Sequence, residues 1–172
     1  QFMGYHRSDG RVGTANYWLF IPTVFCEKRN MDVIREVLQD ELGYSVTAKY
    51  KNYPRELIRA YREGKDLHAP DISLSPAAHQ RSSVFKHVDG IRFLNHEGGC
   101  GGTRQDSAVL GRLLAAYANH PNVGGVTLMS LGCQHLQTGE LEEEIKKINP
   151  AFDKPLYVFE QQRSRSEEQL IA

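Results

Sequence analysis

The chain has 172 residues, the size of one compact domain, and its 21 basic residues equal its 21 acidic residues, so its formal net charge is zero. Lysines and arginines never run longer than a pair, which excludes the basic stripe that nucleic-acid binding requires. No apolar stretch approaches the ~20 residues that cross a bilayer, and no secretory signal opens the chain, so we expect a cytoplasmic protein with no membrane partner.

The chain begins at Gln1 without an initiator methionine, which suggests a piece of a longer protein. We expect an irregular N-terminal motif segment, residues 1–16, that packs on a single α/β domain formed by residues 17–172.

The first strand and helix are clear in the sequence. Residues 17–21 form a short apolar run that ends at Pro22, which is typical of a strand covered on both faces. Apolar residues then recur at helical spacing from 33 to 42, and Gly43 provides a stop.

The same pattern of strand followed by helix continues along the chain. We predict a strand at 44–48 and a helix at 55–62 that Pro54 opens in its first turn. The later elements that we expect are a strand at 91–95, a helix from about 106 to 117, a strand at 126–131, a helix around 141–148 and a strand at 156–159. Residues 66–86 show no period and are expected to be rich in loops. The alternation predicts a three-layer, Rossmann-like α/β sandwich with a mainly parallel sheet of about five strands.

Cysteine and histidine residues follow several of these strands. Cys26 follows the first strand, His96 and Cys100 follow the strand at 91–95, and Cys133 follows the strand at 126–131. Ligands gather at the carboxyl ends of parallel strands, so these side chains would converge on one rim. Thiolate and imidazole suit an iron-class metal. The alternative is that each cysteine is a small buried hydrophobe.

Two further clusters are candidates for anion binding. Residues 98–102 hold four glycines between a strand and a helix, so exposed backbone N–H groups could cradle a carboxylate; a plain tight turn is the alternative. The run matches neither a dinucleotide fingerprint nor a P-loop. Arg7, Asp9, Arg11 and Asn16 could bind the carboxylate and hydroxyls of a sugar acid, or lie in a solvated loop.

Four ordered motifs carry a family resemblance: GYHRSDGRVGTAN at 4–16, IPTVFC at 21–26, HEGGCG at 96–101 and SLGC at 130–133. Together they resemble the central region of the altronate/galactarate dehydratase family, over residues 4–47 and 88–162. The resemblance implies a hydro-lyase that converts an altronate-like or galactarate-like sugar acid into a 2-keto-3-deoxy acid with Fe²⁺ or a similar divalent metal.

The expected catalytic residues are His96, Cys100 and Cys133. His96 is a candidate ligand or base, Cys100 and Cys133 line or ligate the metal, and Cys26 completes the metal site. An iron–sulfur cluster held by the three thiolates is the alternative cofactor.

The expected substrate contacts are the backbone amides of Gly101 and Gly102 with Arg11 for the carboxylate, and Asn16 for a hydroxyl. Gln134 is a further expected contact, at a position where the family usually has glutamate. Ala15 stands where the family usually has arginine. These two departures indicate a changed substrate or a lost activity.

Other functions remain open at this point. The chain could be a non-catalytic domain for anion binding or assembly within a larger enzyme, or a related lyase with another leaving group, such as a sulfolactate sulfo-lyase. The expected partners are a small sugar acid and the missing N- and C-terminal domains of the same protein, and a homodimer is compatible with the sequence. We expect the isolated fragment to be weakly active or inactive.

Overall fold

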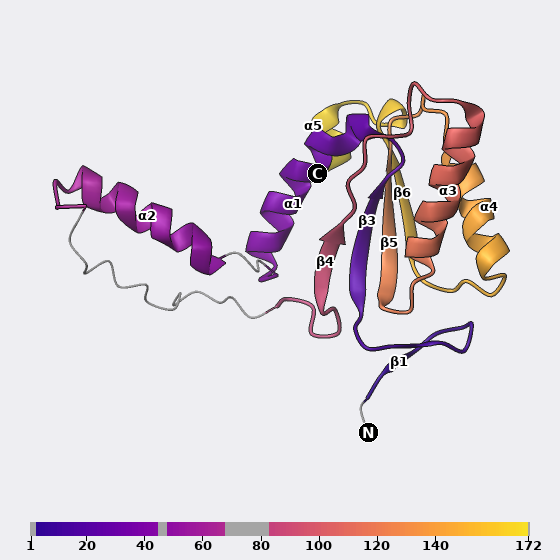
Figure 1. The fold of residues 1–172 in the computed structure, drawn as a ribbon, viewed down its shortest axis with the longest axis horizontal. Helices are drawn as coiled ribbons and strands as arrows, with labels where there is room; N and C mark the ends of the chain where they lie inside the picture. Colours follow the sequence, from indigo (N-terminus) through magenta and orange to yellow (C-terminus); the bar gives the residue numbers. More distant parts are fainter. Residues whose placement is uncertain (1–2, 45–47, 68–82, 172) are drawn as a thin grey trace. The chain divides into compact units, whose positions relative to one another are not determined.

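A computed structural model describes residues 3–44, 48–67 and 83–171. These residues belong to two compact units, one formed by residues 1–37 and 85–172 and the other by residues 38–84. The first unit carries the α/β sheet (Figure 1), and its residue ranges include all the residues expected at the site. The division expected from the sequence, a motif segment at 1–16 and a single α/β domain at 17–172, stays a prediction.

The first unit is built on a parallel four-stranded sheet with the order β4-β3-β5-β6. The strands are β3 (Tyr17–Pro22), β4 (Gly90–Phe93), β5 (Val123–Ser130) and β6 (Leu156–Glu160). Seven of the eight residues of β5 are buried, as a central strand covered on both faces requires. The predicted α/β fold with a parallel sheet is therefore confirmed.

The strand predicted at 44–48 does not appear in the described part of the chain. Tyr44 is irregular, residues 45–47 lie outside the described residues, and Ala48 already begins helix α2 (Ala48–Arg62). Pro54 therefore lies inside α2, and the prediction that it opens the helix is wrong, because tyrosine and leucine residues continue the helical spacing before and after it. Of the expected excursion at 66–86, residues 68–82 also lie outside the description.

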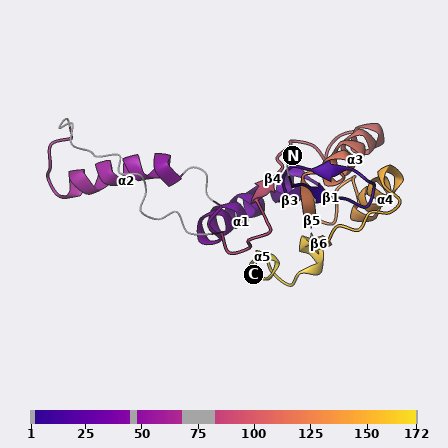
Figure 2. The ribbon, with the colours of Figure 1, turned by 90° about the horizontal axis from the view of Figure 1, so that it is seen from below.

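Helices cover both faces of the sheet. On one face lie α3 (Arg104–Ala118) and α4 (Thr138–Ile148), which pack against alternate residues of β3 and β5. On the other lie the first turns of α1 (Lys28–Glu41) and α5 (Glu167–Ile171). Figure 2, which looks along the strands, shows the sheet between α3 and α4 on one side and α5 on the other. The two cores therefore follow the alternation of side chains along each strand.

The buried face of α3 is formed mostly by small residues rather than by its large apolar ones. Val109, Leu113 and Tyr117 are about half exposed, at 50%, 53% and 46%. Small residues take their place at the contact with the sheet and α4: Ser107, Gly111, Ala115 and Ala118, together with Leu114. Small side chains allow α3 to approach its neighbours closely, which positions its first turn beside the loop after β5.

The remaining elements frame the sheet. A short antiparallel pair, β1 (Tyr5–His6) and β2 (Val12–Gly13), lies at the amino end of the strands. Short 3₁₀ turns, η1 (Phe25–Glu27) and η2 (Gln161–Arg163), follow β3 and β6 at the carboxyl end. None of the helices in the described residues is long and apolar enough to span a membrane.

Candidate functional site

Three loops meet at the carboxyl end of the sheet and form what we call the rim, residues 23–27, 94–103 and 131–137. Backbone hydrogen bonds join them. Phe25 N donates to Gly98 O at 3.0 Å, and His135 N donates to Gly99 O at 3.0 Å. The loop after β4 is therefore bound to the loops after β3 and β5, and segments far apart in the sequence lie together.

Gly99 allows the closest of these contacts. Its φ is +97°, and a Cβ built there would lie 2.3 Å from Thr23 O and 2.7 Å from Val24 Cα. No other residue fits without moving backbone, because both the conformation and the space exclude a side chain. The glycine run therefore has a packing function beside any role in binding.

Each loop of the rim carries one exposed cysteine: Cys26, Cys100 and Cys133. Each cysteine lies within two residues of one of the backbone hydrogen bonds that join the loops. The structure thus brings the three thiol-bearing segments to one edge, as the sequence predicts. Within the described residues, however, no group of three or more His, Cys, Asp or Glu side chains is arranged to hold a metal ion. Metal ligation by these thiols and His96 stays a prediction.

His96 uses both ring nitrogens inside the rim. Nδ1 accepts a hydrogen bond from Gly98 N at 3.2 Å, so the neutral ring carries its proton on Nε2, which lies 2.7 Å from Pro22 O. His96 therefore fastens the loop after β4 to the end of β3. In this conformation neither nitrogen is free to bind a metal or to accept a substrate proton.

The glycine loop presents two different surfaces. Gly101 is exposed, with a φ of +79° and nothing within 4 Å of a built Cβ, so the space beside its Cα is open. Gly102 instead lies against Asp106, whose Oδ2 is 3.1 Å from the built Cβ. Asp106 accepts from Thr103 N at 2.8 Å and forms a capping box at the start of α3.

Hydrogen bonds from Thr103 hold the pKa of the Asp106 carboxyl below its ordinary value, so this group is ionised at neutral pH. A substrate carboxylate at Gly102 would face this negative charge, whereas Gly101 remains accessible. The spacing of threonine and aspartate three residues apart was the sequence signal for this cap.

Gln134 lies inside its loop and does not face the rim surface. It is 2% exposed, its Oε1 accepts from Gly132 N at 2.7 Å, and its Nε2 donates to Ser130 Oγ at 2.7 Å and to Leu136 O at 3.1 Å. All of these bonds shape the turn between β5 and α4. The Gln134 amide therefore shapes its own loop, and the expected contact with substrate stays a prediction.

Arg11 and Asn16 lie at the amino end of the sheet, opposite the thiols, so the structure does not bring them to the rim. Arg11 Nη2 donates to Asn119 O at 2.6 Å, and Arg11 also pairs with Asp9. Asn16 Nδ2 donates to His87 O at 2.8 Å, and its Oδ1 accepts from Arg7 Nη2 at 2.8 Å. Backbone carbonyls and neighbouring side chains already occupy the groups expected to hold the substrate.

Arg7 and Arg11, together with Lys154, bind the end of α3. We call these three residues the clasp. The four consecutive carbonyls of residues 118–121 each accept a hydrogen bond from one of these cations. Positive charge is favourable at the C-terminus of a helix. Burial, reinforced by the two arginines, lowers the pKa of Lys154 to about 8. The sequence reasoning missed Lys154, because a single lysine before a strand carries no signal.

A buried acid next to Cys26 was also missed. Glu27 is fully buried and its Oε2 accepts from Asn30 Nδ2 at 3.0 Å. A glutamate at the start of a helix is usually expected at the surface, so no sequence pattern indicated that Glu27 is buried. The structure thus adds a buried carboxyl group to the loop of the rim that carries Cys26.

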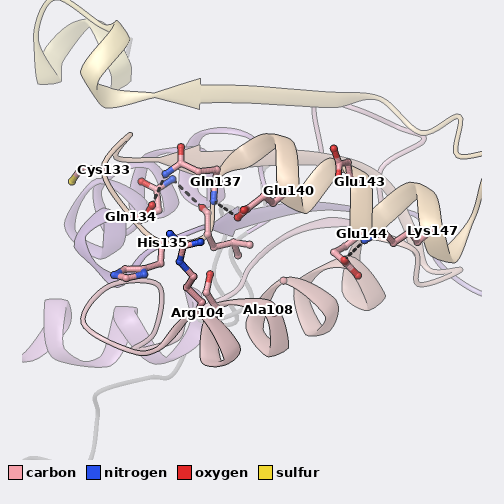
Figure 3. Close-up of a pocket in the computed structure, with 13 residues that line it drawn as sticks. Arg104, Ala108, Cys133, Gln134, His135, Gln137, Glu140, Glu143, Glu144 and Lys147 are labelled. Carbon is pink, nitrogen blue, oxygen red and sulfur yellow. Dashed lines mark hydrogen bonds and ion pairs between the residues drawn. The ribbon is translucent and has the colours of Figure 1, made fainter.

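A groove of about 590 Å³ opens from the rim between α3 and α4 (Figure 3). Cys133 belongs to both the rim and the groove. The groove is lined by the following residues: Arg104, Ser107, Ala108, Gly111, Cys133, Gln134, His135, Leu136, Gln137, Glu140, Glu143, Glu144 and Lys147. The volume is within the range of small-molecule sites, and the lining is rich in polar and charged groups.

Comparison with known proteins agrees with the motifs. Residues 4–172 match the family described as D-galactarate dehydratase/altronate hydrolase, second domain. The chain is 24% identical over 148 residues to an altronate dehydratase of Bacillus subtilis (strain 168), in an alignment that covers 86% of this chain and 22% of that relative. The chain thus spans less than a quarter of the length of this curated relative. No solved structure matches it. The match over nearly the whole chain shows that it belongs to the second-domain family of D-galactarate dehydratases and altronate hydrolases.

Proposed function

We propose that this chain is the part of a hydro-lyase that helps to dehydrate a sugar acid of the altronate or galactarate type to a 2-keto-3-deoxy acid, with Fe²⁺ or a similar divalent metal as cofactor. Family membership supports the hydro-lyase class. The observation that carries the proposal is the joining of the three loops of the rim, which places an exposed thiol from each at one edge of the sheet.

Dehydration next to a carboxylate needs a group that removes the α-proton, stabilisation of the enediolate charge and an acid for the leaving hydroxyl. In our proposal Cys100 and Cys133, the exposed thiols nearest the glycine loop and the groove, contact the reacting carbons. The open amide of Gly101 binds carboxylate oxygen. His96 acts as a positioning residue, because its ring nitrogens are engaged with Gly98 and Pro22.

The described residues do not fit a complete metal site by themselves, since no suitable group of three ligands occurs among them and the ring of His96 is occupied. A divalent metal would act as a Lewis acid when bound. We therefore assign no step to it here, and we propose that the longer protein supplies further ligands beside the thiols.

A second reading has a specific observation in its favour. The same lack of three grouped ligands in the described residues is what a domain for anion binding or assembly would show, with catalysis on other segments of the longer protein. In that case the thiols of the rim would be dispensable for turnover.

One experiment separates the two readings. The full-length protein is purified without oxygen, supplied with Fe²⁺ and assayed with a set of aldonic and aldaric acids for the 2-keto-3-deoxy product. Cys100→Ser and Cys133→Ser should each lower kcat by about 100-fold or more, because each variant removes a thiol that we place against the reacting carbons. Thr14→Ser, an equally small change at the opposite end of the sheet, should leave kcat unchanged. Full activity in both cysteine variants would refute the catalytic proposal and favour assembly.

A further inference from the structure

The groove between α3 and α4 is continuous with the rim. Its end at the rim is lined by Cys133, His135 and the first residue of α3, Arg104 (Figure 3). A sugar acid that reacts at Cys133 has the remainder of its carbon chain to place, and this groove is the cavity that begins there.

The charges that line the groove indicate whether it suits the charged or the uncharged end of a ligand. The groove contains two cationic side chains, Arg104 and Lys147, and three carboxylates, Glu140, Glu143 and Glu144. Lys147 is already paired with Glu144 at 2.6 Å. The lining as a whole therefore has one more carboxylate than cations and is unfavourable for a further anion.

The groups near the rim retain unused hydrogen-bonding capacity. Among the described residues, no hydrogen bond or ion pair involves the guanidinium of Arg104. Glu140 accepts from Gln137 N through Oε2 at 3.2 Å. A carboxylate can accept several hydrogen bonds, so its other oxygen remains to receive one from a hydroxyl.

The length of a sugar acid also indicates Arg104 and Glu140. Along α4 the rise is about 1.5 Å per residue, so Glu144 and Lys147 lie about 6 Å and 10 Å beyond Glu140. The short chain of a sugar acid that starts at the rim meets Arg104 and Glu140 before that ion pair.

We propose that the groove binds the uncharged, hydroxyl-bearing tail of an aldonic acid, with Arg104 donating to its hydroxyls and Glu140 accepting from them, and that it disfavours aldaric acids. An aldaric acid would place its second carboxylate against Glu140, in a groove whose lining already has more carboxylates than cations. The assignment rests on the proposed hydro-lyase function and names the substrate class of that same site.

The test uses the full-length protein and two probes that differ only at the far end, D-altronate and the aldaric acid obtained by oxidising its terminal carbon. Dissociation constants are measured by calorimetry, and kcat/KM for the keto product is measured under anaerobic Fe²⁺. The wild type should bind the aldonate about tenfold more tightly. Glu140→Gln should bring this preference close to one, because glutamine can keep the capping box while removing the charge. Arg104→Gln should weaken both acids.

The matched control is Glu142→Gln, which removes a carboxylate of α4 that does not line the groove and should leave the preference unchanged. Equal or tighter binding of the aldaric acid by the wild type overturns the proposal, as does an unchanged preference in Glu140→Gln while product still forms. If neither acid binds or reacts, the proposed hydro-lyase function fails and this assignment fails with it.

Discussion

Replacement of Gly99 by alanine is the sharpest test of how the rim is held together. The new methyl group would lie 2.3 Å from Thr23 O and 2.7 Å from Val24 Cα, both of them backbone atoms that cannot rotate away. Forced overpacking of this kind costs about 1–3 kcal/mol, and an alanine at a φ of +97° adds about 1–3 kcal/mol of backbone strain. We expect Gly99→Ala to lower the free energy of unfolding by about 3–5 kcal/mol, a large part of the usual total.

Gly101→Ala is the matched control, because Gly101 has a similar left-handed φ of +79° but nothing within 4 Å of a built Cβ. Its expected loss is the strain alone, about 1–2 kcal/mol. The assay is urea unfolding of the 172-residue chain with both variants, and labelling of the cysteines in native buffer as a second readout. If the two variants lose equal stability and Cys26 and Cys100 are labelled at the wild-type rate in both, the loops are not pressed together at Gly99.

Three further predictions concern the contacts around the rim and the clasp. His96→Gln should lower the free energy of unfolding by about 1–2 kcal/mol through its lost hydrogen bonds, whereas the exposed His135→Gln should change it by less than about 0.5 kcal/mol in the same unfolding assay. Arg11→Gln should lower the melting temperature while leaving KM for any turned-over sugar acid unchanged, and a selective rise in KM would restore a substrate role for Arg11. The lowered pKa of Lys154, about 8 against an ordinary 10.5, means that between these values the unfolded chain keeps a proton that the folded chain has lost. Stability relative to Lys154→Met should therefore rise with pH across this window, by about 2 kcal/mol after allowing for solvent screening, and a flat difference between pH 7.5 and 10 would contradict the assignment.

The sequence predicted the sheet well because its signals are local. The buried strand at residues 17–21, the alternation of strand and helix, and the placement of thiols after three strands all follow from composition and spacing over short windows. The carboxyl ends of parallel strands lie at the same edge of a sheet. Cys26, Cys100 and Cys133 each follow one of three such strands, so their loops lie at that edge.

The sequence did not predict which polar groups are already occupied. A guanidinium fits a carboxylate ligand and a backbone carbonyl equally well, so Arg11 carried no signal that it would bind the end of α3. The same holds for Gln134, whose amide satisfies its own loop, and for His96, whose ring joins two loops. These roles depend on contacts across more than 70 residues or on the exact path of a turn, and spacing along the chain does not encode either.

Helix α3 connects the two ends of the sheet and gives the N-terminal motif a role that does not require contact with substrate. Its first turn holds Arg104 in the groove and Thr103 beside the glycine loop, and its last carbonyls are bound by the clasp. A helix is stiff along its axis, so fixing its C-terminus also restricts where its N-terminus lies relative to the thiols. Changes in the clasp should therefore lower the stability of α3 and of the rim that it supports, whereas the choice between substrates should depend on the groove, where Arg104 and Glu140 lie.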